Sequence, residues 1–236
     1  MTGNNHLTTL YNNNNTYRLE DYDTIQPIFE ELKIPKQARI LNIGCGNSEF
    51  SERLYDEGYT NNFNIDIADN VIKYMNSRKG KRKNLHYEVM DVRELKYADE
   101  SFDVVIDKST IDALLCGEHA YMNVAKMTKE ISRVLKTGGI YFIISYGKPE
   151  NRIIHLERDH LAFDIHFYSI KKENDGTNDH EQVHYGYICT KKPEAKENLN
   201  NFDLVYDQLE RDELEEANAE CEEEEEDDVD NYEDVK

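Results

Sequence analysis

Apolar residues recur along residues 17–193 in two alternating patterns. Positions such as Ile25, Ile28, Phe29 and Leu32 follow the spacing of one helix face. Short continuous apolar runs come next, of the kind that form buried strands. Because the two patterns keep exchanging along the chain, they predict a parallel sheet with helices on both faces.

The apolar runs predict five parallel strands separated by helices. The strands are expected at residues 38–44, 62–67, 85–91, 101–109 and 140–147. The helices are expected near 25–34 and at 47–58, 70–78 and 121–137. Pro35 ends the first helix, and Gly138 with Gly139 is expected to cap the last one.

The last part of the domain differs from this alternation. After a helix near 151–160, two strand-like segments at 161–172 and 184–192 are separated by the turn cluster ENDGTND. This cluster leaves no room for a crossover helix, so the two segments are predicted to be antiparallel neighbours. The predicted fold is α/β, with a Rossmann-like, doubly wound, mostly parallel seven-stranded sheet that ends in an antiparallel hairpin.

Composition divides the chain into three parts. Residues 1–16 are polar and Asn-rich, which predicts a flexible arm. Residues 17–193 carry the alternating pattern and are predicted to form one domain. Residues 194–236 are predicted to be an acidic, disordered tail.

The formal charge of −21 is concentrated at the C-terminal end. Residues 207–236 hold 17 acidic residues against two basic ones, and the rest of the chain carries only −6. A body without a basic stripe is not expected to bind nucleic acid. The acidic tail is typical of a solvated end, and the alternative is that it attracts a basic partner.

The four cysteines and the apolar content bear on the compartment. Cys45, Cys116, Cys189 and Cys221 show no metal or disulfide spacing, which predicts free thiols in a reducing compartment. No apolar run approaches the roughly 20 residues of a membrane span, and the first residues lack the features of a signal or transit peptide. We therefore expect no membrane partner and a location in the cytoplasm or nucleus.

Residues 40–50, ILNIGCGNSEF, join a strand to a helix through a glycine turn. Gly44 and Gly46 allow a close backbone approach, and the helix start offers unpaired N–H groups to a ligand. The alternative is a bare turn with no ligand. Acidic residues favour the ligand site, because Asp66, Asp91 and Asp107 end the next three strands and the ends of parallel strands meet in one crevice.

The type of nucleoside follows from the charge near the turn. A dinucleotide-binding loop normally has a third glycine, and this chain has Glu49 at that position. Extra carboxylates repel a pyrophosphate and favour a cationic, phosphate-free ligand. S-adenosylmethionine has this character, and Asp66 is placed to accept bonds from its ribose hydroxyls.

Several segments together resemble a known enzyme family. They are ILNIGCGNSEFSERLYDEGY, NIDIADNVI, MDVRELKYADESFDVVIDKSTIDALLCGE and ISRVLKTGG. These segments resemble the class I methyltransferases that modify elongation factor 1-alpha, most closely the type 4 lysine methyltransferase branch. The resemblance covers about residues 19–192.

The resemblance implies a set of cofactor contacts. The turn residues Gly44, Cys45 and Gly46 would hold the methionine part, and Asp66 the ribose. Ile67 would lie against the adenine. The remaining implied contacts are Asp91 with the adenine amino group, the Val92 amide with the ring, and Asp107 and Lys108 at the floor beside the sulfonium.

On the acceptor side, the resemblance implies that residues 109–113 border the site. Asp107 and Asp112 are the candidate catalytic residues, since their carboxylates would guide an incoming ammonium group. Candidates for lining the acceptor channel on the final hairpin are His166, Tyr168 and Tyr185.

The chain departs from the family pattern at three places. Asn42 stands where an acid is common, and Ser48 stands where a third glycine is common. The family's N-terminal lid carries tryptophans, whereas this chain has none. Tyr17 or Tyr22 is the candidate replacement.

One motif is set aside. His180 and His184 match the H-E-x-x-H zinc pattern, which requires a helix that brings both rings to one face. Here the motif precedes a predicted strand, which would separate the two histidines by about 13 Å. No metal is expected.

The sequence therefore predicts a cytoplasmic, S-adenosylmethionine-dependent protein methyltransferase that modifies a lysine, with elongation factor 1-alpha as the target implied by the family. One alternative is a small-molecule methyltransferase on the same fold. The other is a methyltransferase-like interaction protein that acts without catalysis through its acidic tail.

Overall fold

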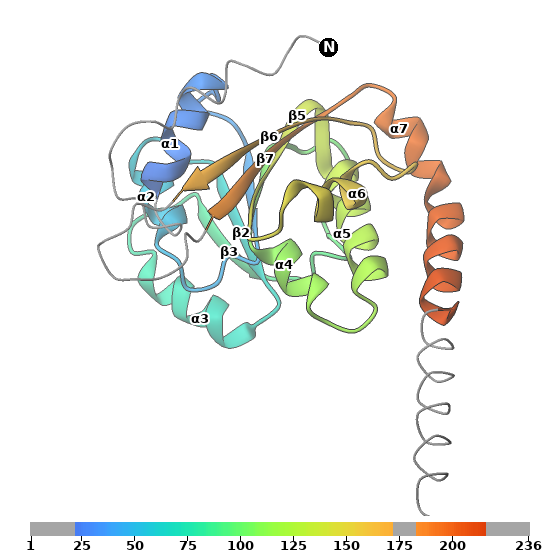
Figure 1. The fold of residues 1–236 in the computed structure, drawn as a ribbon. Helices are drawn as coiled ribbons and strands as arrows, with labels where there is room; N and C mark the ends of the chain where they lie inside the picture. The colour runs from blue at the N-terminus through green and yellow to red at the C-terminus, as the bar shows by residue number, and fades with distance from the viewer. Residues whose placement is uncertain (1–21, 172–182, 216–236) are drawn as a thin grey trace, which may run out of the picture.

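A computed structural model describes residues 22–171 and 183–215 of the protein. Its centre is one seven-stranded sheet in the order β3-β2-β1-β4-β5-β7-β6 (Figure 1). The strands are β1 (Ile40–Ile43), β2 (Asn62–Asp66), β3 (Leu85–Val89), β4 (Phe102–Lys108), β5 (Leu135–Ser145), β6 (Phe163–Lys171) and β7 (Val183–Lys191). The first five pair in parallel, and β7 pairs antiparallel with both β5 and β6. The predicted fold class is confirmed.

Helices cover both faces of this sheet. They are α1 (Tyr22–Glu31), α2 (Phe50–Asp56), α3 (Asp69–Arg78), α4 (Thr110–Leu115), α5 (Ala120–Val134), α6 (Ile153–Leu156) and α7 (Ala195–Asn198), with 3₁₀ turns η2 (Pro149–Asn151) and η3 (Leu199–Asn201). Helices α1, α2 and α3 lie on one side of the sheet, and α4, α5 and α6 lie on the other (Figure 1). Within the described ranges, no helix is long and apolar enough to cross a membrane.

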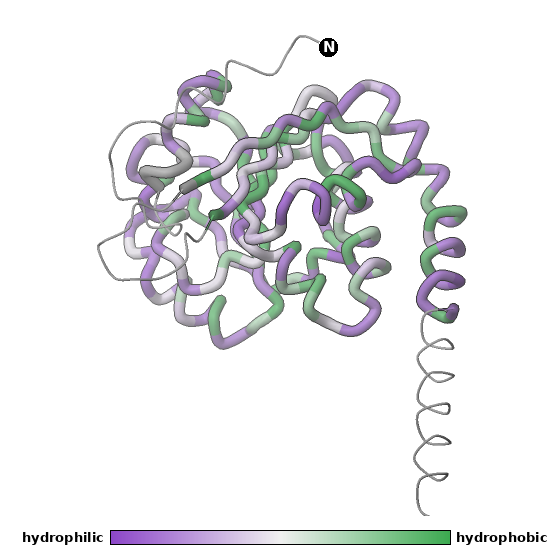
Figure 2. The backbone as a smooth tube through the Cα atoms, viewed as in Figure 1, coloured by the Kyte–Doolittle hydropathy of each residue, from purple (hydrophilic) through white to green (hydrophobic). Residues whose placement is uncertain are grey.

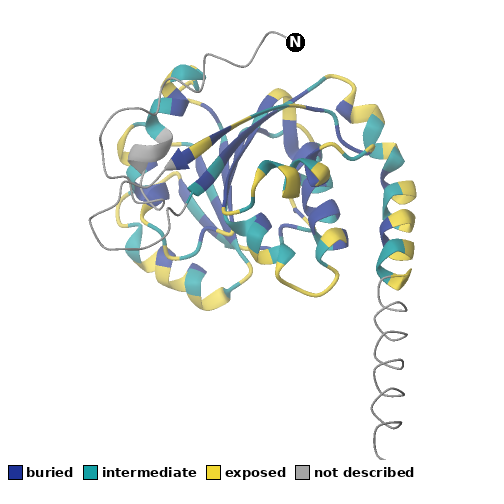
Figure 3. Ribbon diagram, in the orientation of Figure 1, coloured by how far each residue is buried: buried dark blue, intermediate teal, exposed yellow. Residues whose placement is uncertain are grey.

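The core has two layers because successive strand residues point to opposite faces. Leu41, Val105 and Ile143 pack with the α5 side, and their strand neighbours Ile40 and Phe142 pack with α1 and α2. The hydrophobic residues gather in the central strands (Figure 2), and these strands are also the most deeply buried part (Figure 3). Each fully buried large apolar side chain stabilises the fold by about 1.5–3 kcal/mol.

Helix α5 ends earlier than the sequence predicts. It stops at Val134, and Leu135 already pairs with Phe102 of β4. The glycines expected to cap the helix lie inside β5 instead, where the β4–β5 register shifts. A Cβ on Gly139 would stand 2.8 Å from the Lys136 carbonyl oxygen, so glycine is required for this irregular start of the strand.

Residues 195–215 correct the predicted tail boundary. The region contains α7, η3 and a further helix over residues 202–215. Phe202 and Leu209 on this helix are buried against Met122 and Ala125 of α5. A few apolar residues at helical spacing are enough to dock an otherwise charged helix, and the charge count concealed them. The predicted arm at 1–16 and the stretch 216–236 lie outside the described residues.

We predict that Phe202→Ala lowers the free energy of unfolding by about 3 kcal/mol, because it removes a buried ring from the α5 contact. Leu204 lies on the same helix and is 71% exposed, so Leu204→Ala is the matched control, with an expected change below about 0.5 kcal/mol. Urea denaturation followed by circular dichroism measures both. Equal small effects would mean that this helix is not docked on α5.

Candidate functional site

A cavity of about 280 Å³ lies at the carboxyl edge of the parallel strands. It is bounded by residues from the ends of β1, β2 and β4, the segment after β3, and the start of α4. The lining residues are Gly44, Ile65, Asp66, Ile67, Met90, Asp91, Val92, Lys108, Ser109, Thr110, Ala113 and Leu114. Six of the predicted cofactor residues thus line one cavity: Gly44, Asp66, Ile67, Asp91, Val92 and Lys108.

The glycine turn brings α4 against the end of β1. Gly44 has a φ of +54°, and a Cβ there would lie 2.2 Å from Thr110 Oγ1. The Thr110 hydroxyl donates a hydrogen bond to the Ile43 carbonyl oxygen at 3.0 Å. Gly46 has a φ of +55°, and its Cβ position has no atom within 4 Å. The first glycine therefore serves internal packing, and the second leaves open backbone beside the turn.

Asp66 links the glycine turn to the cavity. Its Oδ2 accepts the Gly46 N–H at 2.9 Å, and its Oδ1 accepts the Ala68 N–H at 2.9 Å. The side chain lines the cavity and is half-buried. A carboxylate oxygen has two lone pairs, so each oxygen can still accept one hydrogen bond from a ligand.

Asp91 is held by an arginine that the sequence analysis did not identify. Arg93 Nη2 donates to Asp91 Oδ2 at 2.7 Å, and the Arg93 N–H donates to Oδ1 at 2.8 Å. Arg93 Nη1 also donates to Asn123 Oδ1 of α5 at 2.8 Å. Hydrogen bonds from Arg93 hold the pKa of Asp91 below its usual value, so the carboxylate stays ionised.

The comparison with protein families decides the class. A family model described as a methyltransferase domain matches residues 34–178, which is more than half of the chain. This chain belongs to that methyltransferase family. The prediction of a class I methyltransferase is confirmed.

Two mouse relatives are similar to this methyltransferase. The eEF1A lysine and N-terminal methyltransferase of Mus musculus is 44% identical over 131 residues, covering 53% of this chain and 19% of the relative. EEF1A lysine methyltransferase 4 of Mus musculus is 32% identical over 171 residues, covering 64% of this chain and 67% of the relative. The methyltransferase thus spans about a fifth of the first of these relatives.

A solved structure shows the same fold. The structure of a SAM-dependent methyltransferase from Methanosarcina mazei has a TM-score of 0.52 at 18% identity. The match covers 70% of this chain and 97% of that one. At this identity, the likeness shows the fold alone.

Asp107 is not at the cavity wall, contrary to its predicted role. It is fully buried and accepts hydrogen bonds from the Thr110 N–H at 2.7 Å and the Tyr141 hydroxyl at 2.8 Å. The Ile111 N–H donates to the same carboxylate at 3.2 Å. In the methyltransferase, Asp107 therefore fixes the start of α4 from inside the core and is not one of the residues that line the cavity.

Cys45 also differs from its predicted role. Its side chain is buried with Ile72, Met75 and Leu85, and its N–H donates to the Ile65 carbonyl oxygen at 3.0 Å. Burial raises the pKa of the Cys45 thiol to about 12. Neither the thiol nor the N–H is available to a cofactor.

Asp112 does not stand free to guide an ammonium group. Arg152 Nη2 donates to Asp112 Oδ1 at 2.6 Å, and each of these side chains is 13% exposed. The Ser145 hydroxyl and the Tyr146 N–H donate to the same carboxylate. The charge of Asp112 is balanced by Arg152, which argues against its predicted role of guiding the incoming ammonium group.

None of the three predicted acceptor-lining residues on the final hairpin lines this cavity. Tyr168 is buried in the apolar layer on the α1 side, so it does not line a channel. His166 lies mid-strand on β6, with Nε2 3.5 Å from Asp164 Oδ2. Tyr185 is half-buried on β7 against the α5-side layer. Tyr17 and the side chain of Tyr22 are outside the described part of the structure.

Asn42 explains one departure from the family pattern. It is 3% exposed, and its side-chain amide donates to Ser51 Oγ at 3.0 Å and to Asn64 Oδ1 at 3.3 Å. The Ser51 hydroxyl donates to the same Asn64 oxygen. A neutral amide suits this buried network below the glycine turn better than an ionised carboxylate would.

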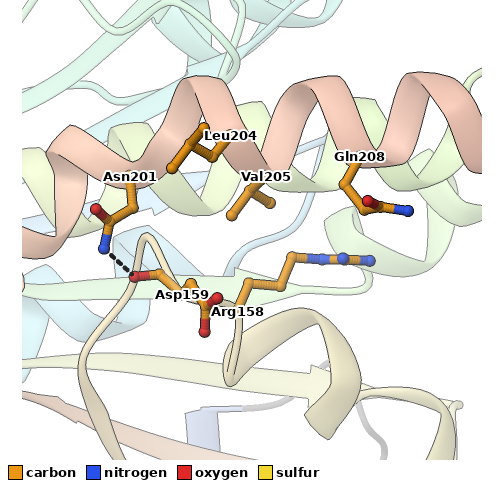
Figure 4. A pocket seen from close by; sticks show the side chains of 6 residues that line it. All are labelled: Arg158, Asp159, Asn201, Leu204, Val205 and Gln208. Carbon is orange, nitrogen blue, oxygen red and sulfur yellow. Dashed lines mark hydrogen bonds between the residues drawn. The ribbon is translucent and has the colours of Figure 1, made fainter.

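A larger cavity of about 590 Å³ lies elsewhere on the methyltransferase (Figure 4). Figure 4 shows Arg158 and Asp159 of the loop after α6 facing Leu204, Val205 and Gln208 on the 202–215 helix. Among the residues described by the structure, none at a strand end lines it. The smaller cavity, which combines strand ends, the glycine turn and carboxylates, is therefore the candidate active site.

The zinc motif has no counterpart in the described structure. His184 is buried in β7, and His180 lies outside the described residues. Within the described residues, no group of three or more histidines, cysteines or acidic residues could hold a metal ion.

We predict that Asp107 makes the methyltransferase less stable as pH rises. Burial raises its pKa from 3.8 to about 6, so between these values the folded state holds a proton that the unfolded chain releases. As the pH rises from about 4 to about 6, the unfolding free energy of the wild type should therefore fall relative to that of Asp107→Asn. Above about pH 6 the difference between the two proteins should become constant.

Urea denaturation of both proteins between pH 4 and pH 7 measures this difference, and the subtraction removes the contribution of the other titrating groups. A difference that moves in the opposite direction would show that the hydrogen bonds to Asp107 outweigh its burial.

Proposed function

We propose that the chain is an S-adenosylmethionine-dependent protein methyltransferase that modifies a lysine of elongation factor 1-alpha. The observation that carries the proposal is the cavity at the strand ends, where Asp66 and Asp91 face an apolar wall beside the glycine turn. Membership of the methyltransferase family supports the reaction class and the cofactor.

The residues present fit this cofactor. Asp66 has acceptor capacity left for the two ribose hydroxyls, and the open side of Gly46 leaves backbone accessible to the amino-acid part. Ile67, which is 68% exposed, and Met90 offer apolar surface for a purine ring. The cavity therefore combines a polar end for the ribose with an apolar end for the base.

Two charged residues would set the orientation of the cofactor. Arg93 keeps Asp91 ionised and fixed, so Asp91 can accept a hydrogen bond from the adenine amino group. Lys108 is the last residue of β4 and lines the cavity at the other end from Asp91, because β1 and β2 separate β4 from β3 in the sheet. An ammonium group there suits the carboxylate of the methionine part. This assignment places Lys108 with the carboxylate and away from the cationic sulfonium.

When bound, S-adenosylmethionine supplies an electrophilic methyl group that an unprotonated amine can take by in-line displacement. The protein's tasks are to align the acceptor nitrogen and to exclude water. A lysine acceptor must lose its proton, from a reference pKa of about 10.4. Apolar surface around the acceptor favours that loss, because it disfavours the charged amine.

The target is supported by the names of the two mouse relatives, both of which are eEF1A lysine methyltransferases. We further propose that the enzyme acts in the cytoplasm. The 17 acidic residues of 207–236 support a role in attracting a basic partner, since opposite charges speed encounter.

We expect calorimetric titration to show binding of S-adenosylmethionine to the wild type, and Asp66→Ala to weaken it by about tenfold or more. Asp66→Asn keeps one acceptor oxygen, so its affinity for S-adenosylmethionine should lie between those of wild type and Asp66→Ala. Asp164→Ala removes an exposed carboxylate from β6 and is the matched control, with unchanged affinity expected.

Transfer of labelled methyl groups from S-adenosylmethionine to purified elongation factor 1-alpha tests the target. Mass spectrometry of the labelled protein should locate the methyl groups on lysine. Cofactor binding without labelling of any protein in a cell extract would reject the proposed protein substrate and favour a small-molecule acceptor. Absence of cofactor binding would reject the enzyme itself.

A further inference from the structure

The side chain of Arg152 organises the segment that follows β5. Arg152 Nε donates to Ser145 Oγ at 2.9 Å, and Arg152 Nη2 donates to Asp112 Oδ1 at 2.6 Å. The Gly147 N–H also donates to Ser145 Oγ, at 2.9 Å. A largely buried guanidinium therefore joins the end of β5, the following segment and α4 in one network.

Gly147 lets the guanidinium lie directly against the backbone. A Cβ at this position would stand 2.1 Å from Arg152 Cζ and 2.3 Å from its Nε. The Gly147 carbonyl oxygen accepts the Tyr187 hydroxyl at 2.6 Å, which ties the same segment to β7. Hydrogen bonds to Asp112 of α4 and from Tyr187 of β7 thus fix the path of residues 145–147.

Tyr146 lies in the middle of this fixed segment. Its N–H donates to Asp112 Oδ2 at 3.1 Å, and its ring centre lies 4.3 Å from that of His184. His184 is 2% exposed, whereas Tyr146 is 60% exposed. The Tyr146 ring is therefore exposed at the surface and packs against the buried His184 ring.

The position of this ring relates it to the candidate active site. The N–H of Ser109, a cavity residue, donates to the Ile144 carbonyl oxygen two residues before Tyr146, at 2.9 Å. Asp112, which binds the Tyr146 N–H, is followed directly on α4 by the cavity residues Ala113 and Leu114. The backbone of Tyr146 therefore lies at the carboxyl edge of the sheet beside α4, and its ring lies against His184 near the start of β7.

We propose that Tyr146 contacts the side chain that accepts the methyl group, and that Arg152 is a positioning residue that holds Tyr146 through Asp112 and Ser145. The inference rests on the proposed function. An exposed tyrosine ring packs well against the methylene stem of a lysine, and its face attracts an ammonium group. Such a wall binds the acceptor without touching the cofactor.

The test separates acceptor binding from cofactor binding. We expect Tyr146→Ala to raise the KM for elongation factor 1-alpha by about tenfold while the calorimetric Kd for S-adenosylmethionine stays unchanged. Tyr146→Phe keeps the ring and should stay within about threefold of wild type. Tyr74→Ala is the matched control, since Tyr74 is 51% exposed but lies on α3.

Two further variants test the positioning role. Gly147→Ala places a methyl group where the guanidinium lies, so it should raise the acceptor KM as Tyr146→Ala does, again with unchanged cofactor Kd. Arg152→Ala should raise the acceptor KM in the same way. Arg152→Lys keeps the positive charge but loses the planar fork, so its acceptor KM should lie between those of wild type and Arg152→Ala. An unfolded Arg152→Ala protein would leave Gly147→Ala and Arg152→Lys to decide the point.

The outcomes are distinguishable. Wild-type methylation with an unchanged acceptor KM in Tyr146→Ala overturns the role of Tyr146 and leaves the proposed function standing. A raised KM in Tyr146→Ala without any effect of Gly147→Ala overturns only the positioning role. A wild type that binds cofactor but labels no protein overturns the proposed protein substrate and the acceptor contact with it.

Discussion

The close approach of α4 to the end of β1 is the contact on which the site depends. Gly44 leaves no side chain in the way, so the Thr110 hydroxyl reaches the Ile43 carbonyl oxygen. From the other side, the buried Asp107 carboxylate fixes the first N–H groups of α4. These two contacts set one wall of the cavity, since Thr110, Ala113 and Leu114 all line it. They also place Asp112 where it can hold the segment after β5.

Much of this arrangement could be predicted from local sequence. The strand runs, the two glycines and the acids at strand ends are short-range signals, because a parallel sheet brings its carboxyl ends together in any order of strands. Asp66 and Asp91 illustrate this, as both line the predicted crevice. The antiparallel end of the sheet followed from a turn cluster too short for a helix.

The errors share a different physical cause. Whether a carboxylate faces a ligand or the core depends on partners distant in sequence, and Asp107 meets Tyr141 while Asp112 meets Arg152. The α5 boundary likewise depends on pairing between Leu135 and Phe102 on another strand. For residues 195–215, the high charge of the segment outweighed two apolar positions in the sequence analysis. A fold can use such sparse contacts because the docking surface on α5 is already formed.

The docking of the 202–215 helix has a consequence for the acidic stretch. Phe202 and Leu209 fix this helix on α5, on the same side of the sheet as α4 and the segment that carries Arg152. Whatever follows residue 215 therefore starts from a fixed point on the enzyme. A charged segment attached in this way has a high effective concentration near its own catalytic domain, set by the length of chain beyond the anchor. Recruitment of a basic protein and its presentation to the active site would then be one intramolecular search.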